Sequence, residues 1–401
     1  MQNKRLLFLL DDIWSMGKNK GVVSLYKLVK KCDFKNNLII FTTEKNELKK
    51  DFPNADIYYF RPTFTIDNKR NRYYKLALNR LNIVSINLQY IYKFITLKNK
   101  KYDLLYCSSA IPVYASIFIQ KVFNIKSVHR MYGTFLYPKL GNYIEYLKNL
   151  EEVIFFKAQT DKYIITNDGT YGDKVAKYFN IPSSKIAFLR NGVSRYTLTL
   201  SQNEIYKKYS LEENKFYILS VSRLVNWKRV DRMIQTMNKI EKGNIVFLVV
   251  GDGPEKEKLQ AITEKNNVKF LGAKTHMEVR ELMNVVDVFI SMYDLSNVGN
   301  PLLEALVEGC AIITYDTGDT ASVIDGKNGI LIPFYSNEEK KIIKTLRNHI
   351  EELAYDNDKL QVLRRNALLY ADKHLVDWDK RIEDEISILS DVIVSRRGDE
   401  K

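Results

Sequence analysis

Short apolar runs alternate with amphipathic segments along most of the chain. The first run is RLLFLL at residues 5–10, and a Gly-containing loop leads from it to a helix expected at about 22–31. Short apolar runs predict buried strands, and apolar positions at helical spacing predict the helices that pack on them. The alternation continues with strands expected at 37–41, 56–59, 104–108, 126–135, 163–166 and 186–189 and helices at 73–97, 111–123, 143–158 and 173–179. This rhythm predicts an α/β fold with a parallel, doubly wound sheet, which binds ligands beyond the carboxyl ends of its strands.

The pattern pauses and then restarts in the second half. Residues 193–215 are polar and irregular, which places a domain boundary near residue 195. A second series follows, with strands expected at 216–222, 244–251, 268–272, 286–292, 311–315 and 330–333 and helices at 230–239, 255–266, 276–285 and 301–308. An amphipathic helix is expected at 374–395. The sequence therefore predicts two Rossmann-like domains, 1–195 and 196–375, and a C-terminal segment, 376–401.

The junction at 291–320 is the richest in candidate chemistry. The strand before it breaks into a polar loop that opens a helix at Pro301, with Glu304 expected on the first helical turn. Proline suits a helix start because its missing N–H would be unpaired there, and the other N–H groups at the start favour an anion. The junction predicts a phosphate or sugar site with Glu304 facing the ligand. The same residues are explained by an ordinary strand-to-helix turn in which the Glu304 carboxylate interacts with the N-terminus of its own helix.

Composition narrows the class of protein. A chain of 401 residues, 45% of them hydrophobic, is globular and of a length for about two to three domains. Its three cysteines lack CxxC spacing and it has only four histidines, so neither a disulfide framework nor a zinc site is expected. The first apolar run is too short for a signal-peptide core, and no apolar run is long enough to span a membrane.

Charge differs between the two halves of the sequence. Residues 1–200 hold 33 Lys and Arg against 15 Asp and Glu, whereas the remainder holds 29 against 33. A basic first half indicates an anionic partner such as a phospholipid surface or a lipid-linked phosphate. Nucleic acid is not expected, since the aromatic and basic stretches at 70–74 and 90–101 match no recognition module. A lysine-rich, solvated surface explains the same charge.

Five ordered pieces of the sequence carry a family resemblance. They are RNGVS (190–194), SVSRLVNWKRVDRMI (220–234), VVGDGPEKEKL (249–259), VKFLGAKTHMEVRELMNVVDVFIS (268–291) and GNPLLEALVEGCAIITYDTGDTASVIDGKNGILIP (299–333). Together they resemble retaining glycosyltransferases of the GT-B fold, family four (glycosyl transferases group 1). The resemblance covers about residues 186–335, and over 1–185 it is architectural only. It implies two Rossmann-like β/α/β domains that face each other across a cleft, with a terminal helix that crosses back onto the first domain.

The resemblance implies that the second domain binds the sugar donor. Arg223 and Lys228 are similar to the basic pair that holds the donor's diphosphate, and Glu304 is similar to the glutamate that binds the ribose hydroxyls. These three are the candidate catalytic residues. Fixed cations aimed at the diphosphate oxygens suit a leaving group that gains negative charge.

The loop before Glu304 is expected to meet the donor sugar and phosphate, with N–H groups available from every residue except the proline. Its expected donor-binding residues are Gly299, Asn300, Pro301 and Leu302. The family has a further glutamate eight residues before Glu304, and here Ser296 stands in that place. Ser296 is expected to make one hydrogen bond to the sugar, with Asp294 as the acid that compensates.

The acceptor side is predicted in the first domain. By resemblance, Gly17 and Lys18 are expected across the cleft from the donor phosphates. The family often places a histidine before the glycine that follows a strand. Here Tyr132 precedes Gly133, and His129 lies three residues upstream, so Tyr132 and His129 are alternative candidates to approach the acceptor. A histidine on a strand is also commonly a core residue.

The implied activity is sugar transfer with retention at the anomeric carbon, without a metal and without a bound cofactor. The co-substrate would be a nucleotide sugar, a UDP- or GDP-sugar, and the acceptor a glycan or a lipid-linked molecule in cell-surface polysaccharide, lipopolysaccharide or teichoic-acid synthesis. The expected location is cytoplasmic, with an anionic membrane surface as a candidate partner for the basic half. Two other classes fit the same residues: a GT-B sugar-nucleotide epimerase and a non-catalytic nucleotide-sugar-binding protein.

Overall fold

The chain divides into two compact units. The computed structural model describes residues 3–10, 23–33, 37–43, 48–66, 71–241, 243–336 and 338–395. Unit 1 holds Met1–Asn167, Tyr171–Asn191 and Trp378–Lys401, and unit 2 holds Asp168–Thr170 and Gly192–Asp377. Gly17 and Lys18, which were expected near the acceptor, lie outside the described residues.

Unit 1 is built on a seven-stranded parallel sheet with the strand order β3-β2-β1-β4-β5-β6-β7. Its strands are β1 (Arg5–Leu9), β2 (Asn37–Thr42), β3 (Asp56–Tyr59), β4 (Leu104–Ser108), β5 (Ser127–Met131), β6 (Lys162–Thr166) and β7 (Ile186–Leu189). Its helices are α1 (Val23–Asp33), α2 (Arg72–Thr96), α3 (Val113–Phe123), α4 (Tyr143–Lys148), α5 (Leu150–Lys157), α6 (Gly172–Tyr178) and α14 (Trp378–Val394). Short 3-10 turns lie at Leu48–Lys50, Tyr137–Lys139 and Ser183–Lys185.

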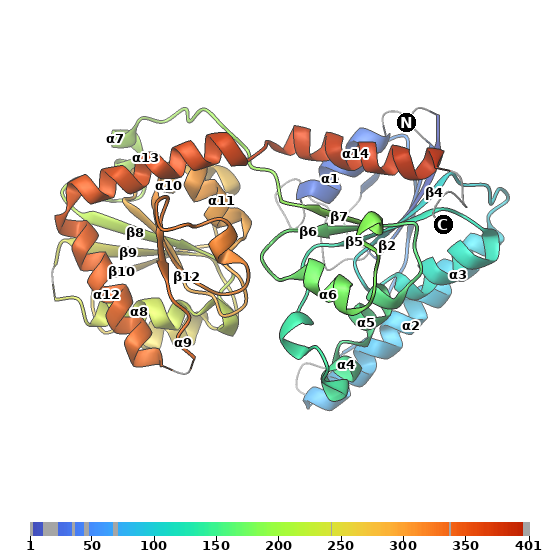
Figure 1. The fold of residues 1–401 in the computed structure, drawn as a ribbon, viewed down its shortest axis with the longest axis horizontal. Helices are drawn as coiled ribbons and strands as arrows, with labels where there is room; N and C mark the ends of the chain where they lie inside the picture. The colour runs from blue at the N-terminus through green and yellow to red at the C-terminus, as the bar shows by residue number, and fades with distance from the viewer. Residues whose placement is uncertain are drawn as a thin grey trace. The chain divides into compact units, whose positions relative to one another are not determined.

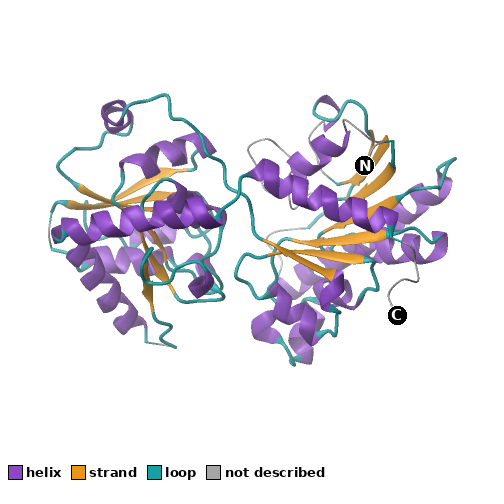
Figure 2. Cartoon of the chain, turned by 45° about the horizontal axis from the view of Figure 1, so that its top comes forward, coloured by secondary structure: helices purple, strands orange, loops and turns teal. Residues whose placement is uncertain are grey.

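Both faces of this sheet are covered by helices, as Figures 1 and 2 show. Along β1 the side chains alternate between the two faces. Leu6 and Phe8 pack with α1 and α14, whereas Leu7 and Leu9 pack with α2 and α3. A strand that is buried on both sides is apolar throughout, which is why the strands of this unit could be predicted as continuous apolar runs.

Helix α14 belongs to unit 1 although it lies near the end of the sequence. Its Ile382, Leu389 and Val392 are part of the core on the α1 side of the sheet. Glu385 is also buried there, where its carboxylate accepts a hydrogen bond from Tyr106 (2.7 Å) and pairs with Arg381 (2.8 Å). Buried polar contacts of this kind fix the position of the helix on the sheet.

Unit 2 is built on a six-stranded parallel sheet with the order β10-β9-β8-β11-β12-β13. Its strands are β8 (Phe216–Val221), β9 (Ile245–Val250), β10 (Val268–Gly272), β11 (Val288–Ser291), β12 (Ala311–Tyr315) and β13 (Ile330–Ile332). Its helices are α7 (Gln202–Lys208), α8 (Val230–Asn238), α9 (Lys256–Ala261), α10 (His276–Val285), α11 (Asn300–Val307), α12 (Glu339–Tyr355) and α13 (Asn357–His374). Short 3-10 turns lie at Asn226–Lys228 and Thr320–Ser322.

The strands were predicted well and several helices were not. The segment predicted as a strand at 126–135 ends at Met131, and the helix predicted at 143–158 is two helices that meet at Asn149. The helix predicted at 255–266 ends at Ala261. The segment 193–215 was predicted to be irregular and contains α7, which begins with a capping box of Ser201 and Glu204.

Candidate functional site

The candidate site lies where the chain reverses direction across the sheet of unit 2. β8 and β11 are neighbours, and from them the strand order runs outward in opposite directions. In doubly wound sheets this switch point leaves a crevice at the carboxyl ends of the two central strands. The loop after β8 contains Arg223 and Lys228, and the loop after β11 contains the residues from Met292 to Gly299.

A pocket of about 300 Å³ opens at this edge of the sheet. It is lined by Arg223 from the β8 loop and by Pro301 of α11, so the structure brings these two predicted residues together. The other lining residues end β8 and β9, follow β8, β9 and β10, or belong to α10: Val221, Ser222, Val250, Gly251, Asp252, Ala273, Lys274 and Val279. Gly251 has a φ of 137°, and a side-chain carbon there would collide with the carbonyl oxygen of Ser222. Glycine therefore allows the first two loops to approach each other.

Lys228 lies against two aromatic rings. Its Nζ is 4.0 Å from the ring centroid of Trp227 and 3.7 Å from that of Tyr293. Tyr293 is buried, and its hydroxyl donates to the carbonyl oxygen of Val221 (3.1 Å). Among the described residues, no carboxylate lies within ion-pair distance of Nζ. Burial lowers the pKa of Lys228 to about 7, against an opposing effect of the Asp168 charge. The rings thus hold a cation whose counter-ion is not supplied by the described residues.

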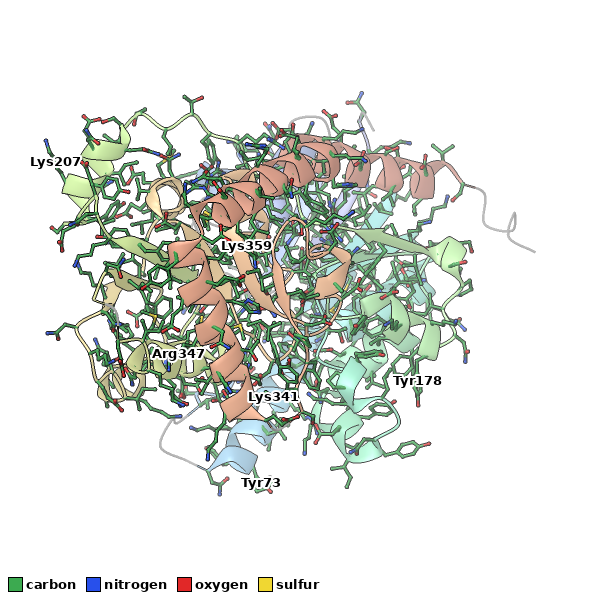
Figure 3. The ribbon with its side chains drawn as sticks, turned by 60° about the vertical axis from the view of Figure 1, so that its left-hand side comes forward. Tyr73, Tyr178, Lys207, Lys341, Arg347 and Lys359 are labelled. Atoms are coloured by element: carbon green, nitrogen blue, oxygen red, sulfur yellow. The ribbon has the colours of Figure 1, made fainter. Side chains whose placement is uncertain are left out.

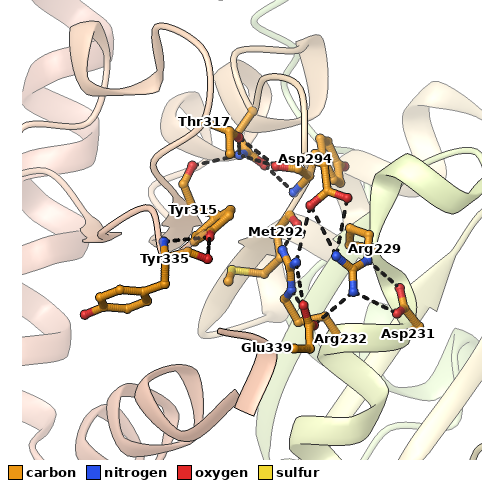
Figure 4. A network of polar contacts seen from close by, with 11 residues as sticks. Arg229, Asp231, Arg232, Met292, Asp294, Tyr315, Thr317, Tyr335 and Glu339 are labelled. Carbon is orange, nitrogen blue, oxygen red and sulfur yellow. Dashed lines mark hydrogen bonds and ion pairs between the residues drawn. The ribbon is translucent and has the colours of Figure 1, made fainter. Parts of the chain in front are cut away.

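Asp294 forms ion pairs with two arginines, the N-cap residue of α8 and a residue within that helix. Its carboxylate pairs with Arg229 (3.3 Å) and Arg232 (3.3 Å), and both arginines also pair with Glu339 of α12 (Figure 4). Arg232, which is almost fully buried, also donates to the carbonyl oxygen of Met292 (2.9 Å). This network ties the loop after β11 to two helices. The arginine contacts of Asp294 were not foreseen from the sequence.

The Ser296 hydroxyl forms hydrogen bonds with main-chain groups of its own unit. Its hydroxyl donates to the carbonyl oxygen of Asp168 (2.6 Å) and accepts from the N–H of Val298 (3.1 Å), and the residue is buried. Gly169 has a φ of 77°, and a side-chain carbon there would collide with the Ser296 hydroxyl. The hydrogen bond expected from Ser296 to a donor sugar is therefore already made, in this structure, to the main chain.

Asn297 holds the same loop from inside and was missed by the sequence analysis. It is fully buried, and its side-chain oxygen accepts from the N–H of Tyr293 (3.0 Å). Its amide group donates to the carbonyl oxygen of Tyr315 (2.8 Å) and to the hydroxyl of Thr317 (2.9 Å). A satisfied buried amide of this kind fixes one loop conformation. The signal that could have indicated this role is the position of an asparagine between a buried strand and the start of a helix.

The start of α11 differs from the prediction in two ways. The helix begins at Asn300 with Gly299 as its N-cap, so Pro301 is its second residue and Glu304 lies beyond the first turn. The N–H of Gly299 donates to the carbonyl oxygen of Asn297 (2.8 Å). The N–H of Leu302 donates to the carbonyl oxygen of Gly299 (3.1 Å). Two of the N–H groups expected to be available to a ligand are therefore used within the loop. The Leu302 side chain is buried in the core.

Glu304 faces α10, the neighbouring helix. The residue is buried, and its Oε1 lies 2.9 Å from Nε2 of His276, the first residue of α10. The hydrogen bond with Glu304 raises the pKa of His276 above its ordinary value. The His276 side chain remains about 41% exposed, so the pair joins a buried carboxylate to an accessible imidazole. His276 was not predicted, because it stands 28 residues before Glu304 on a different helix.

The predicted acceptor residues in unit 1 have different surroundings. His129 is completely buried in β5, where its Nε2 lies 2.8 Å from the Ser116 hydroxyl, and burial lowers its pKa to about 3. It is a core residue and presents no surface to an acceptor. The Tyr132 ring is partly buried beneath the guanidinium of Arg130 (4.5 Å), and its hydroxyl lies 3.0 Å from that of Ser108. Gly133 follows with a φ of 148°. Of the two alternatives, only Tyr132 stays a candidate.

Among the residues that the structure describes, no three side chains of His, Cys, Asp or Glu are grouped as ligands for a metal ion.

The geometry is that of a doubly wound α/β domain with a pocket at the switch point of its sheet; Arg223 lines this pocket, and Glu304 pairs with His276 of α10. Residues 201–368 match the family described as Glycosyl transferases group 1. The family resemblance is confirmed over these residues, which contain four of the five sequence motifs; RNGVS (190–194) precedes them.

Individual relatives are distant. An uncharacterized glycosyltransferase of Methanocaldococcus jannaschii is 22% identical over 243 residues, which are 58% of this chain and 62% of the relative. The GtfA subunit of a UDP-N-acetylglucosamine–peptide N-acetylglucosaminyltransferase from Streptococcus pneumoniae is 24% identical over 256 residues, 61% of this chain and 48% of the relative. The chain thus spans about half to three fifths of the length of these curated relatives.

The crystal structure of Anabaena HepE in complex with UDP and glucose resembles the whole fold. The TM-score is 0.71 at 16% identity, with 97% of this chain and 100% of that chain covered. At this identity the likeness shows the fold alone. The predicted GT-B fold, with two Rossmann-like domains, is confirmed.

Proposed function

We propose that the chain is a glycosyltransferase that moves a sugar from a nucleotide-sugar donor, bound by unit 2, to a glycan or lipid-linked acceptor. The observation that carries the proposal is the position of Arg223 and Lys228 on the loop after β8, with Arg223 lining the pocket at the switch point of the sheet. The match of residues 201–368 to the family and the UDP bound by a protein of the same fold support a donor such as a UDP- or GDP-sugar.

In the proposed reaction the bond between the anomeric carbon and the diphosphate oxygen breaks while a bond to the acceptor oxygen forms. The acceptor attacks on the face that the diphosphate leaves, so configuration is retained, and the acceptor proton passes to a phosphate oxygen. Arg223 offers a planar fork of donors to the departing charge and Lys228 a compact cation. Glu304 is the proposed ribose ligand, and its pairing with His276 sets the orientation of its carboxylate.

The first test is a thermal-shift screen against UDP-, GDP-, ADP- and CMP-sugars. A ligand that binds only the folded protein raises its stability, so the donor is identified without knowledge of the acceptor. Arg223→Ala and Lys228→Ala are expected to abolish both the shift and transfer to a membrane or glycan extract while far-UV circular dichroism stays unchanged. Normal activity of both variants would refute the site.

A second candidate function is nucleotide-sugar binding without transfer. It is favoured by one observation, that Ser296 stands in place of the family's first glutamate and its hydroxyl is already bonded to the main chain. Calorimetry that detects donor binding, with no transfer to any acceptor, would favour this candidate. Conversion of the donor when it is incubated alone would instead identify the epimerase predicted as the other alternative.

The proposed setting is cell-surface polysaccharide, lipopolysaccharide or teichoic-acid synthesis at the cytoplasmic side of a membrane. The excess of basic over acidic residues in the first half of the sequence supports an anionic surface as partner. Fractionation of cells that express the tagged chain, at low and at high salt, tests the location. Recovery of the whole population in the aqueous fraction at low salt would refute it.

A further inference from the structure

Helix α2 exposes an apolar stripe along its outer side. Seven residues of α2 are apolar or aromatic, are exposed, and follow one another at intervals of three or four positions: Tyr73, Ala77, Leu81, Val84, Leu88, Tyr92 and Ile95. We call them the outer stripe. At about 100° per residue they fall within a band about 100° wide, and at 1.5 Å per residue the band is about 33 Å long. Exposure reaches 60% at Leu88, 71% at Tyr92 and 82% at Tyr73.

Helix α2 has apolar residues on its inner side as well as on its outer side. On the inner side, Ile86, Tyr90 and Phe94 pack on the sheet, and two asparagines are also buried there. Asn82 bonds the backbone of Phe64, and Asn87 bonds the carbonyl oxygen of Ile111. An amphipathic helix normally buries its apolar side and exposes its polar side. Here two polar amides are buried among the inner apolar residues, and further leucines and tyrosines face outward.

Of the helices that the structure describes, α2 carries the longest such stripe. Shorter exposed apolar groups lie on α4 (Tyr143, Ile144, Leu147) and α13 (Val362, Leu368, Leu369). The outer sides of α12 and α13 carry charged residues such as Lys341, Arg347 and Lys359, whereas Tyr73 projects from the start of α2 (Figure 3). Contiguous exposed apolar surface of this kind marks a binding surface. Within the described part of the chain, no helix is long and apolar enough to cross a bilayer.

Charge identifies what the outer stripe binds. Residues 71–102 contain seven Lys and Arg and no Asp or Glu. None of the ion pairs between described residues involves Lys75, Arg80 or Lys93, and the Nζ of Lys93 lies over the Tyr58 ring (4.1 Å). A second copy of the helix would bring the same cations together without a carboxylate to compensate them, which opposes self-association. An anionic lipid surface offers both the negative charge and the apolar depth.

We propose that α2 lies in the plane of an anionic membrane, with the outer stripe inserted at the level of the lipid headgroups. Tyr73 and Tyr92 suit that level because their rings are apolar and their hydroxyls are polar. This proposal deepens the membrane setting of the proposed function. Binding to vesicles requires neither donor nor acceptor, so it is tested separately from catalysis.

The experiment is co-sedimentation of the full chain with phosphatidylcholine vesicles, with and without phosphatidylglycerol. The unaltered protein is expected to bind only the anionic vesicles, and more weakly as salt is raised. Leu81→Ser with Leu88→Ser should weaken binding by about tenfold for each leucine, because partial burial of a leucine contributes roughly one decade of affinity. Val362→Ser with Leu369→Ser removes two exposed apolar residues of α13 and is the matched control. It should bind like the unaltered protein.

A far-UV circular dichroism spectrum and a thermal unfolding midpoint equal to those of the unaltered protein show that the Leu81/Leu88 variant is folded. Three results would overturn the proposal: no binding of the unaltered protein to anionic vesicles, equal weakening in the control variant, or unchanged binding of the Leu81/Leu88 variant. Loss of a dimer in the Leu81/Leu88 variant, measured by light scattering without lipid, would also overturn it and would assign the outer stripe to contact between two copies. None of these results bears on donor binding by unit 2.

Discussion

The Nζ of Lys228 lies 3.7 Å from the centroid of the Tyr293 ring. Tyr293 is buried and stands two residues after the end of β11. The contact joins the loops that follow the two central strands of unit 2. Because Tyr293 is also bonded to the carbonyl oxygen of Val221, the position of the cation is fixed relative to the sheet and not only to its own loop.

The first prediction concerns pH. Burial lowers the pKa of Lys228 to about 7, so the unliganded side chain is charged below that pH and increasingly neutral above it. Since the proposed diphosphate binds the charged form, the donor Kd should rise by up to about tenfold per pH unit above 7. Calorimetry between about pH 6 and pH 9 measures this. Lys228→Arg stays charged throughout and should bind with little pH dependence. An equally flat profile in the unaltered protein would contradict the assignment.

The His276–Glu304 pair should make the free energy of unfolding depend on pH. Here the pKa of His276 is raised in the folded state, whereas that of Lys228 is lowered. The pKa of His276 is raised in the folded state, so the stabilisation is complete below its ordinary value and is lost as pH rises through the raised value. Urea unfolding followed at several pH values measures the effect. His276→Gln keeps a hydrogen-bond donor but cannot titrate, and the difference between the two proteins should therefore change across that range. A constant difference would show that the imidazole does not titrate there.

The arginine network around Asp294 should be a large contributor to stability. Arg232→Ala leaves the buried carbonyl oxygen of Met292 without this donor and leaves Glu339 paired with Arg229, and such a loss costs about 1–3 kcal/mol. Chemical unfolding should therefore show a lower midpoint. Arg347→Ala removes an exposed pair with Glu351 on α12 and is the control, with an expected effect within about 0.5 kcal/mol. Similar effects of the two substitutions would refute the role of the network.

Replacement of Ser296 tests whether the family's missing glutamate can be restored. Ser296→Glu is expected to weaken donor binding, because the hydroxyl is packed against Gly169 and bonded to Asp168, and no space is left for a longer side chain. Ser296→Ala should cost about 1 kcal/mol of stability through loss of that hydrogen bond. Donor titration and thermal unfolding distinguish the two effects. Tighter donor binding by the glutamate variant would show that the loop can rearrange to admit the acid.

A fifth prediction concerns Glu385, which is buried among Arg130, Arg381 and Tyr106. Burial alone would raise its pKa, and the two arginines outweigh that effect and lower it. Glu385→Ala leaves both guanidinium groups buried without the carboxylate and should cost about 3–5 kcal/mol. Glu383→Ala on the same helix removes an exposed contact with Lys31 and should cost little. Equal unfolding midpoints for the two variants would contradict the importance of the buried cluster.

The sequence predicted the structural features that depend on residues close together in the chain, above all the positions of the strands. Each strand buried on both faces is an apolar run, so strand positions were found to within a few residues. α7 was missed although Ser201 and Glu204 form a readable capping box, because the surrounding residues are polar. α9 was predicted too long, since its last turn at Ala261 has no sequence signal as strong as proline or glycine.

Contacts between distant residues account for what could not be predicted at the site. The arginines that pair with Asp294 also pair with Glu339, 45 residues later, and the partner of Glu304 is His276 on another helix. Burial of His129 follows from packing against Phe155 and Tyr163, which the sequence separates from it by more than 25 residues. Local pattern and family motif indicate which residues are near the site, whereas the tertiary fold decides which of their polar atoms are already used.

The place of α14 in unit 1 has a consequence for how the chain is made. A ribosome releases the strands of the first sheet long before it has synthesised Ile382, Glu385 and Leu389, which complete the core over those strands. Domains generally fold as units in the order of synthesis. Here the nascent first unit lacks the part of its core that α14 supplies, including the Glu385 carboxylate beside Arg130, until all of unit 2 has been translated. The second unit is therefore expected to be the first to reach its final fold.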